Sequence, residues 1–194
     1  MQSTGYRAAQ RFEEACARFE SGEGRGDVLV QTVDAPSAIA PHTAAWHAKI
    51  QSPSPAPGQG RLALAFDPDS PESWGGPFRV ILFLTVPLDT AVAQDPLLAE
   101  VAWSWLTDAL GENAPGSHSV AGTISKTFNT GFGALATHRE GTVLELRASW
   151  TPLEAELGGC RTAWVQALAL FAGLPPVAPE HGVTPLRGGF GEYV

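Results

Sequence analysis

Apolar residues recur along the chain with two periods, and these periods predict its helices and strands. Apolar residues that recur every three to four positions predict helices over 4–20 and 95–110. Asp95 is the expected N-cap of the second helix and Gly111 its stop. A capping box at Thr151, followed by proline, predicts that a third helix begins there.

Large aromatic side chains indicate which helix faces are buried. Trp105 falls on the apolar stripe of the second helix and Trp164 on that of the third, so we expect both in the core. Trp103 lies well round the helix from Trp105, which indicates a wide apolar face or a second contact. Trp103 is therefore a candidate contact residue.

Alternating or continuous apolar runs predict the strands. Residues 61–66 alternate cleanly, whereas 78–86 are apolar at nearly every position, as in a central strand covered on both faces. Residues 119–128 and 142–150 are expected to form a hairpin. The remaining predicted strands are 43–50 and, at a sheet edge, 28–33.

Together these elements predict an α+β fold: a mostly antiparallel twisted sheet of about five strands with helices packed on one face. The expected order is helix, three strands, helix, two strands, helix, with an additional edge strand near the N-terminus. No repeat or interdomain linker interrupts the pattern, so we expect one domain over 1–194. Residues 177–194 are rich in glycine and proline and are expected to be mostly irregular.

Composition and charge narrow the classes of partner. Of 194 residues, 44% are hydrophobic and 16% charged, which suits a globular protein and excludes disorder for most of the chain. The formal net charge of -8 and the scattered single arginines argue against nucleic-acid binding. No apolar run is long enough to span a membrane, and Cys16 and Cys160 are typical of core residues in a reducing compartment. We therefore expect a cytoplasmic protein.

The sequence lacks the residue patterns of common catalytic sites, including GxSxG, GxxxxGK[ST], HExxH and paired cysteines at zinc spacing. Asp67, Asp69 and Glu72 follow the end of a strand and are the best metal candidate, because calcium and magnesium prefer oxygen ligands. Aspartate beside proline more often forms a turn. We therefore expect neither a metal nor a cofactor.

The polar face of the predicted hairpin is the main candidate for a binding surface. Its side chains are Thr123, Ser125, Thr127, Glu145 and Arg147. If all strands share one sheet, this face adjoins Ile81 and Phe83, and an apolar centre with a hydroxyl and charged rim is typical of an interface. The alternative is an ordinary solvated sheet in which Glu145 lies beside Arg147.

Three further residues complete the candidate set. Trp74 is the loop aromatic that we expect to contact a partner. His47 and Arg79 lie on predicted strands, and with Arg147 and the hairpin hydroxyls they supply the polar groups that a small-molecule site needs. His47 alone is more typical of a hydrogen-bonded surface histidine than of a catalytic base.

Four segments carry a family likeness: 40–41 (AP), 95–110 (DPLLAEVAWSWLTDAL), 147–152 (RASWTP) and 172–176 (AGLPP). Together they resemble the actinobacterial family known as domain of unknown function 3000, over nearly the whole chain. The resemblance implies an actinobacterial source but no activity and no catalytic residue. Genes of this family often lie near one for a ribonuclease-D-like enzyme, so nucleic-acid association stays a third hypothesis.

The leading hypothesis is a non-enzymatic binding or adaptor protein that holds another protein, or a second copy of itself, on one sheet face. The alternative is a small-molecule-binding protein or enzyme with a pocket between the sheet and the helices.

Overall fold

The computed structural model describes residues 2–51, 57–133 and 141–176, so the tail predicted over 177–194 lies outside the described residues. Its centre is a six-stranded sheet in the order β1-β2-β3-β4-β6-β5, and every neighbouring pair is antiparallel. The strands are β1 (Val28–Val33), β2 (His42–Ile50), β3 (Gln59–Phe66), β4 (Phe78–Leu88), β5 (His118–Asn129) and β6 (Gly141–Thr151). The predicted α+β class is confirmed, and β1 is the additional edge strand.

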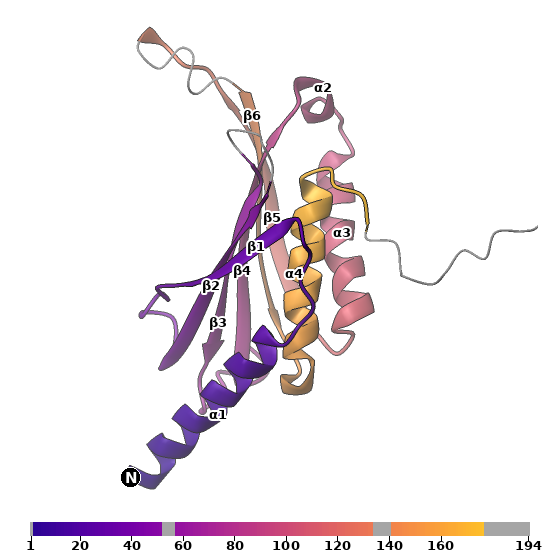
Figure 1. Cartoon of the computed structure of the whole chain (residues 1–194). Helices are drawn as coiled ribbons and strands as arrows, with labels where there is room; N and C mark the ends of the chain where they lie inside the picture. Colours follow the sequence, from indigo (N-terminus) through magenta and orange to yellow (C-terminus); the bar gives the residue numbers. More distant parts are fainter. Residues whose placement is uncertain (1, 52–56, 134–140, 177–194) are drawn as a thin grey trace, which may run out of the picture.

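The helices pack on one face of this sheet (Figure 1). They are α1 (Gln2–Glu20), α2 (Thr90–Ala93), α3 (Leu98–Asn113), the 3-10 turn η2 (Glu154–Glu156) and α4 (Leu157–Phe171). Phe19 of α1 stacks near Trp46 of β2 with ring centroids 4.2 Å apart and lies 6.4 Å from Trp164 of α4. Phe19 therefore joins α1 both to the sheet and to α4. The short helix α2 was not predicted.

The core lies between the sheet and the helices. The even-numbered residues of β3 and β6, and those of β4 up to Val86, are buried against the helical layer. Most odd-numbered side chains of β4 and β6 are only partly buried. Trp164 is fully buried, as predicted. A Cβ at Gly60 would lie 2.9 Å from Trp164 Nε1, so glycine at this position lets α4 approach the sheet.

The second predicted helix is displaced toward the C-terminus. Asp95 Oδ1 accepts a 2.8 Å hydrogen bond from the backbone N–H of Leu97, which forms a local turn, and α3 begins only at Leu98. Gly111 does not stop the helix, which continues to Asn113. Both predicted ends of this helix were therefore wrong.

The predicted capping box at Thr151 is also wrong. Thr151 ends β6 and is buried, and its hydroxyl donates to the carbonyl of Trp74 while it accepts a 3.0 Å bond from Arg79. Because these tertiary contacts engage the hydroxyl, it does not cap a helix. The chain instead passes through η2, and α4 begins at Leu157.

We predicted that Trp105 lies in the core, but its side chain is not fully buried. It is half-buried and meets Phe171 edge-on, with ring centroids 5.6 Å apart. Leu106 takes the buried position in this turn of α3. The buried stripe therefore passes through Leu106 rather than Trp105, and neighbouring residues are about 100° apart around the helix axis.

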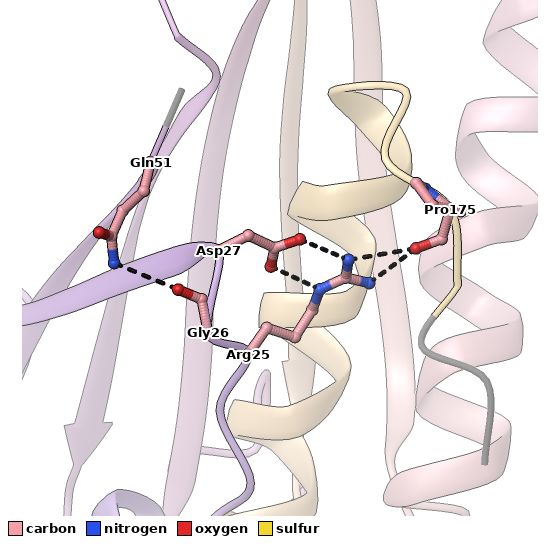
Figure 2. A network of polar contacts seen from close by, with 5 residues as sticks. All are labelled: Arg25, Gly26, Asp27, Gln51 and Pro175. Atoms are coloured by element: carbon pink, nitrogen blue, oxygen red, sulfur yellow. Dashed lines mark hydrogen bonds and ion pairs between the residues drawn. The ribbon is translucent and has the colours of Figure 1, made fainter. Parts of the chain in front are cut away.

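Arg25, whose side chain is 7% exposed, ties the segment before β1 to the segment after α4 (Figure 2). Arg25 donates to both carboxylate oxygens of Asp27, at 2.9 and 2.8 Å, and to the carbonyl of Pro175, at 3.2 and 3.1 Å. These hydrogen bonds hold the pKa of the Asp27 carboxyl below its usual value. Beside them, Gln51 donates to the carbonyl of Gly26. Together these hydrogen bonds link residues 25–27 to Gln51 and to Pro175.

Candidate functional site

The sheet face opposite the helices, here called the open face, is formed by odd-numbered residues of the strands, on β5 from Ala121 onward. The register confirms that the hairpin shares this face with β4, because Thr123 pairs with Arg147 and Arg147 pairs with Phe83. Ile81 and Phe83 are half-buried here. No described helix covers them, so the expectation that β4 is covered on both faces was wrong.

Five side chains form a row across the open face, here called the arginine row. They are His47, Arg61, Phe83, Arg147 and Thr123. Neighbouring members lie on adjacent strands, which are about 4.8 Å apart. The Cζ atom of Arg147 is 5.4 Å from the centre of the Phe83 ring, a cation–π contact. The row therefore places two guanidinium groups on either side of one aromatic ring.

A parallel row of mostly small side chains forms a trough beside the arginine row. Its members are Ala45, Ala63, Ile81, Ser149 and Ala121. Over β4, β6 and β5 the trough is a shallow depression of about 540 Å³, bounded by Phe83, Arg147 and Thr123. All members of this row, here called the small row, are alanine or serine except Ile81. These short side chains rise less above the sheet than those of the neighbouring rows, and this difference creates the depression.

Arg79 lies on the other side of the trough. It donates to the hydroxyls of Thr151 and Ser149, at 3.0 and 2.7 Å. Within the described residues no carboxylate lies within ion-pair distance of this guanidinium. Partial burial lowers the pKa of Arg79 from its ordinary value. Its neutral partners leave the positive charge uncompensated.

The connection between β1 and β2 closes the other half of the trough. Arg61 donates to the carbonyl of Asp34, and Thr43 donates to the carbonyl of Pro36 at 3.0 Å. Ala45 of the small row is fully buried as a result. The accessible part of the trough is therefore the part over β4, β6 and β5.

Charge is distributed unevenly between the open face and the rest of the chain. The described strands place four cationic residues and one acidic residue on this face: Lys49, Arg61, Arg79 and Arg147, with Glu145. The other described residues comprise 6 cationic and 16 acidic residues. The open face is thus positive on a protein of net charge -8.

The strand β5 forms the edge of the sheet next to the trough. Most of its 12 residues are exposed, and its pairing with β6 is regular from Ala121 to Asn129. A bulge interrupts the register only near its start, between His118 and Ala121. Its outer edge makes no hydrogen bond to another described part of the chain. The backbone groups along this edge are therefore open to a partner.

The predicted candidates fall in different places. Trp103 lies on the helix side of the sheet, where a Cβ at Gly122 would be 2.7 Å from its ring, so it does not join the open face. Trp74 is half-buried, and its carbonyl accepts from Thr151 at the Arg79 end of that face. Ser125 and Thr127 lie on the open face farther along β5 than the trough.

The remaining polar candidates make ordinary local contacts. His47 lies 3.3 Å from the side chain of Gln59, and Glu145 lies 3.6 Å from Arg147. Asp67 accepts from the backbone N–H of Asp69 at 3.0 Å, as in an Asx turn. Neither these residues with Glu72 nor any other acidic, histidine or cysteine group in the described ranges is arranged to hold a metal ion.

A second cleft, of about 320 Å³, lies on the helical side. It is bounded by the Arg25 segment, by Trp105 and Asp108 of α3 and by Gln166 of α4. The hypothesis of a pocket between sheet and helices involved His47, Arg79 and Arg147, and none of these lines the cleft. The space between the described sheet and helices is instead filled by the core.

These features define an α+β protein with an antiparallel sheet, helices on one face and a cationic trough on the other. The family model described as "Protein of unknown function (DUF3000)" matches residues 8–184, and the chain belongs to this family. No curated protein and no solved structure matches the chain. Within the described residues, no helix is both long and apolar enough to cross a bilayer.

Proposed function

We propose that this protein is a non-enzymatic binding protein that receives an extended segment of another polypeptide as an additional strand on β5. The observation that carries the proposal is the exposed, regular edge of β5 from Ala121 to Asn129, beside a trough whose β4, β6 and β5 part no described segment covers. In strand addition, backbone hydrogen bonds supply affinity and side-chain pockets supply specificity. Here the β5 edge would supply the backbone hydrogen bonds, and the trough would supply a side-chain pocket.

The composition of β5 supports an edge that is open for pairing. Proteins commonly protect edge strands with lysine, proline or bulges. Lys126 is the only lysine or arginine in β5, and its ammonium donates to the carbonyls of Ala93 and Asp95, at 3.4 and 3.0 Å. It therefore turns toward the helical side. The bulge near His118 leaves the following residues regular.

The trough reaches the β5 edge at two small residues. Ala121 ends the small row, and Gly122 follows it. A side chain on an added strand beside Ala121 would enter the trough and meet Ser149 and then Ile81. The opening thus gives a partner strand a defined position for one of its side chains.

The chemistry of the described residues supports binding rather than catalysis. Burial raises the pKa of the Cys160 thiol, which disfavours the thiolate that a nucleophile needs. His47 contacts Gln59 rather than a hydroxyl or a thiol. The trough itself presents hydroxyls, guanidinium groups and apolar side chains, which are binding groups.

We propose a partner of different sequence rather than a second copy. Two copies joined through β5 would place two cationic open faces side by side, and like charges repel. Both cysteines are free thiols, which supports the cytoplasm as the compartment. The alanine, glycine, proline and arginine bias supports an actinobacterial source.

Synthetic peptides test the mode of binding. The probe is a labelled peptide of about nine residues that alternates glutamine with valine, matching the regular length of β5. One form is N-methylated at alternate residues, which leaves one edge able to pair, and another at every residue, which blocks both edges. Fluorescence anisotropy with the full chain measures binding of each form.

Strand addition predicts that the peptide N-methylated at alternate residues binds, because one edge can still pair. The peptide N-methylated at every residue should not bind. Equal binding of the two forms, or binding of neither, would overturn the proposal. Sedimentation of the protein alone provides a second test. A dimer that the peptide dissociates would show that the edge serves a second copy, contrary to the proposal.

A further inference from the structure

Arg79 is a partly buried cation whose hydrogen-bond partners are neutral. A guanidinium has five N–H donors, and the described contacts involve the hydroxyls of Thr151 and Ser149. Removing a charge from water is costly unless an opposite charge compensates it, so buried cations are usually paired. No described carboxylate fills this role. The position of Arg79 therefore favours an anionic ligand at the trough.

Arg147 offers a second guanidinium on the opposite side of the trough. Its side chain is 70% exposed, and its pairing with Glu145 is long, at 3.6 Å. An exposed ion pair of this kind and the exposed cation–π contact with Phe83 each contribute little, so the side chain can turn toward a ligand. Ser149 lies between the two arginines, two residues from Arg147 on β6 and 2.7 Å from Arg79.

The wider distribution of charge agrees with this local arrangement. The open face is positive although the chain as a whole carries -8. Such a segregated field attracts an anionic partner to this face and repels it from the rest of the surface. A strand added to β5 would meet the trough at Ala121. A side chain entering there approaches Ser149 and Arg147, which line the trough, and Arg79 donates to the same Ser149 hydroxyl.

We infer that the segment received by β5 is acidic, and that one of its aspartate or glutamate carboxylates binds Arg147 and Arg79 in the trough. The inference rests on the proposed function. Phe83 and Ile81 form the apolar wall beside these charges, so the neighbouring part of the same side chain packs against them. A nucleic-acid partner is disfavoured by the net charge of -8.

The test compares three peptides that, like the earlier probe, are N-methylated at alternate residues, so that only one edge can pair. They alternate valine with glutamate, glutamine or lysine. We expect the glutamate peptide to bind about tenfold more tightly than the glutamine peptide at low salt, and the lysine peptide to bind most weakly. The preference for glutamate should shrink as salt screens the charges.

Variants locate the source of this preference. Arg147→Gln together with Arg79→Met should bring the glutamate and glutamine peptides within about twofold of each other, with little change for the glutamine peptide. Arg7→Gln removes an exposed cation on α1, away from the open face, and should leave the preference unchanged. Circular dichroism of each variant confirms that it is folded.

The outcomes separate the two proposals. Equal binding of the glutamate and glutamine peptides, with the N-methylation pattern intact, would overturn the acidic partner and leave strand addition standing. Loss of the N-methylation pattern would overturn strand addition itself. A single-stranded oligonucleotide that binds through Arg79 and Arg147 more tightly than the glutamate peptide would also overturn the inference of an acidic polypeptide.

Discussion

Arg79 donates a 2.7 Å hydrogen bond to the hydroxyl of Ser149 and so joins β4 to β6 beside the trough. Because this cation has no described carboxylate partner, replacing it with methionine keeps the apolar stem and removes an uncompensated charge. We expect Arg79→Met to change the free energy of unfolding by less than about 1 kcal/mol, in either direction. Urea unfolding at pH 7 measures this change.

Arg25 provides the matched control, since its side chain is also largely enclosed but has a carboxylate partner. Arg25→Met removes the bidentate bonds to Asp27 and the contact with Pro175 (Figure 2). We expect a loss of about 2 kcal/mol, because Asp27 is itself partly exposed and can be rehydrated. An equally large loss for Arg79→Met would mean that Arg79 is a structural residue.

Two helical glycines should respond in opposite directions to the same substitution. A Cβ at Gly159 would lie 1.8 Å from the carbonyl oxygen of Asn113, so Gly159→Ala forces α3 and α4 apart and should cost about 1–3 kcal/mol. Gly111 has open space around it within α3, so Gly111→Ala should stabilise by about 0.5–1 kcal/mol. Thermal unfolding of both variants checks the close packing of the two helices.

Two tryptophans distinguish the observed helix faces from the predicted ones. Trp164 is fully buried, and Trp164→Ala should cost about 3–5 kcal/mol through lost burial and a cavity. Trp105 is half-buried beside Phe171, and Trp105→Ala should cost only about 1 kcal/mol. Similar losses for both variants would contradict the half-buried position of Trp105 beside the buried Leu106.

The Asp27 carboxyl makes part of the stability dependent on pH. Its folded-state pKa is lowered by the hydrogen bonds from Arg25, so the folded protein binds fewer protons than the unfolded chain in acid. This contribution is present above the unfolded pKa of 3.8 and is lost as pH falls through the folded pKa. Asp27→Asn should therefore destabilise the protein at pH 7 more than at pH 3, as measured by urea unfolding.

Local patterns were sufficient to predict most of the fold. The alternation of 61–66 and the apolar run of 78–86 located β3 and β4 because side chains on a strand alternate between its faces. Helix ends were less predictable. Asp95 and Thr151 have the chemistry of N-caps, but a local turn and a tertiary contact with Trp74 engage them instead.

The candidate site was only partly predictable, because it depends on pairing between distant strands. The polar hairpin face and its neighbours Ile81 and Phe83 were identified from alternation alone. Arg61 was missed, since only the register of β2, β3 and β4 places it between His47 and Phe83. The open edge of β5 was missed as well, because strand order is not contained in the local pattern.

Hydrogen exchange along β5 tests the central claim most directly. In the free protein, we expect rapid and slow amides to alternate from Ala121 to Asn129, because only every second N–H points toward β6. Saturating glutamate peptide should slow the rapid amides by about tenfold or more and leave the amides of α1 unchanged. Bound peptide with unchanged exchange in β5 would contradict the account.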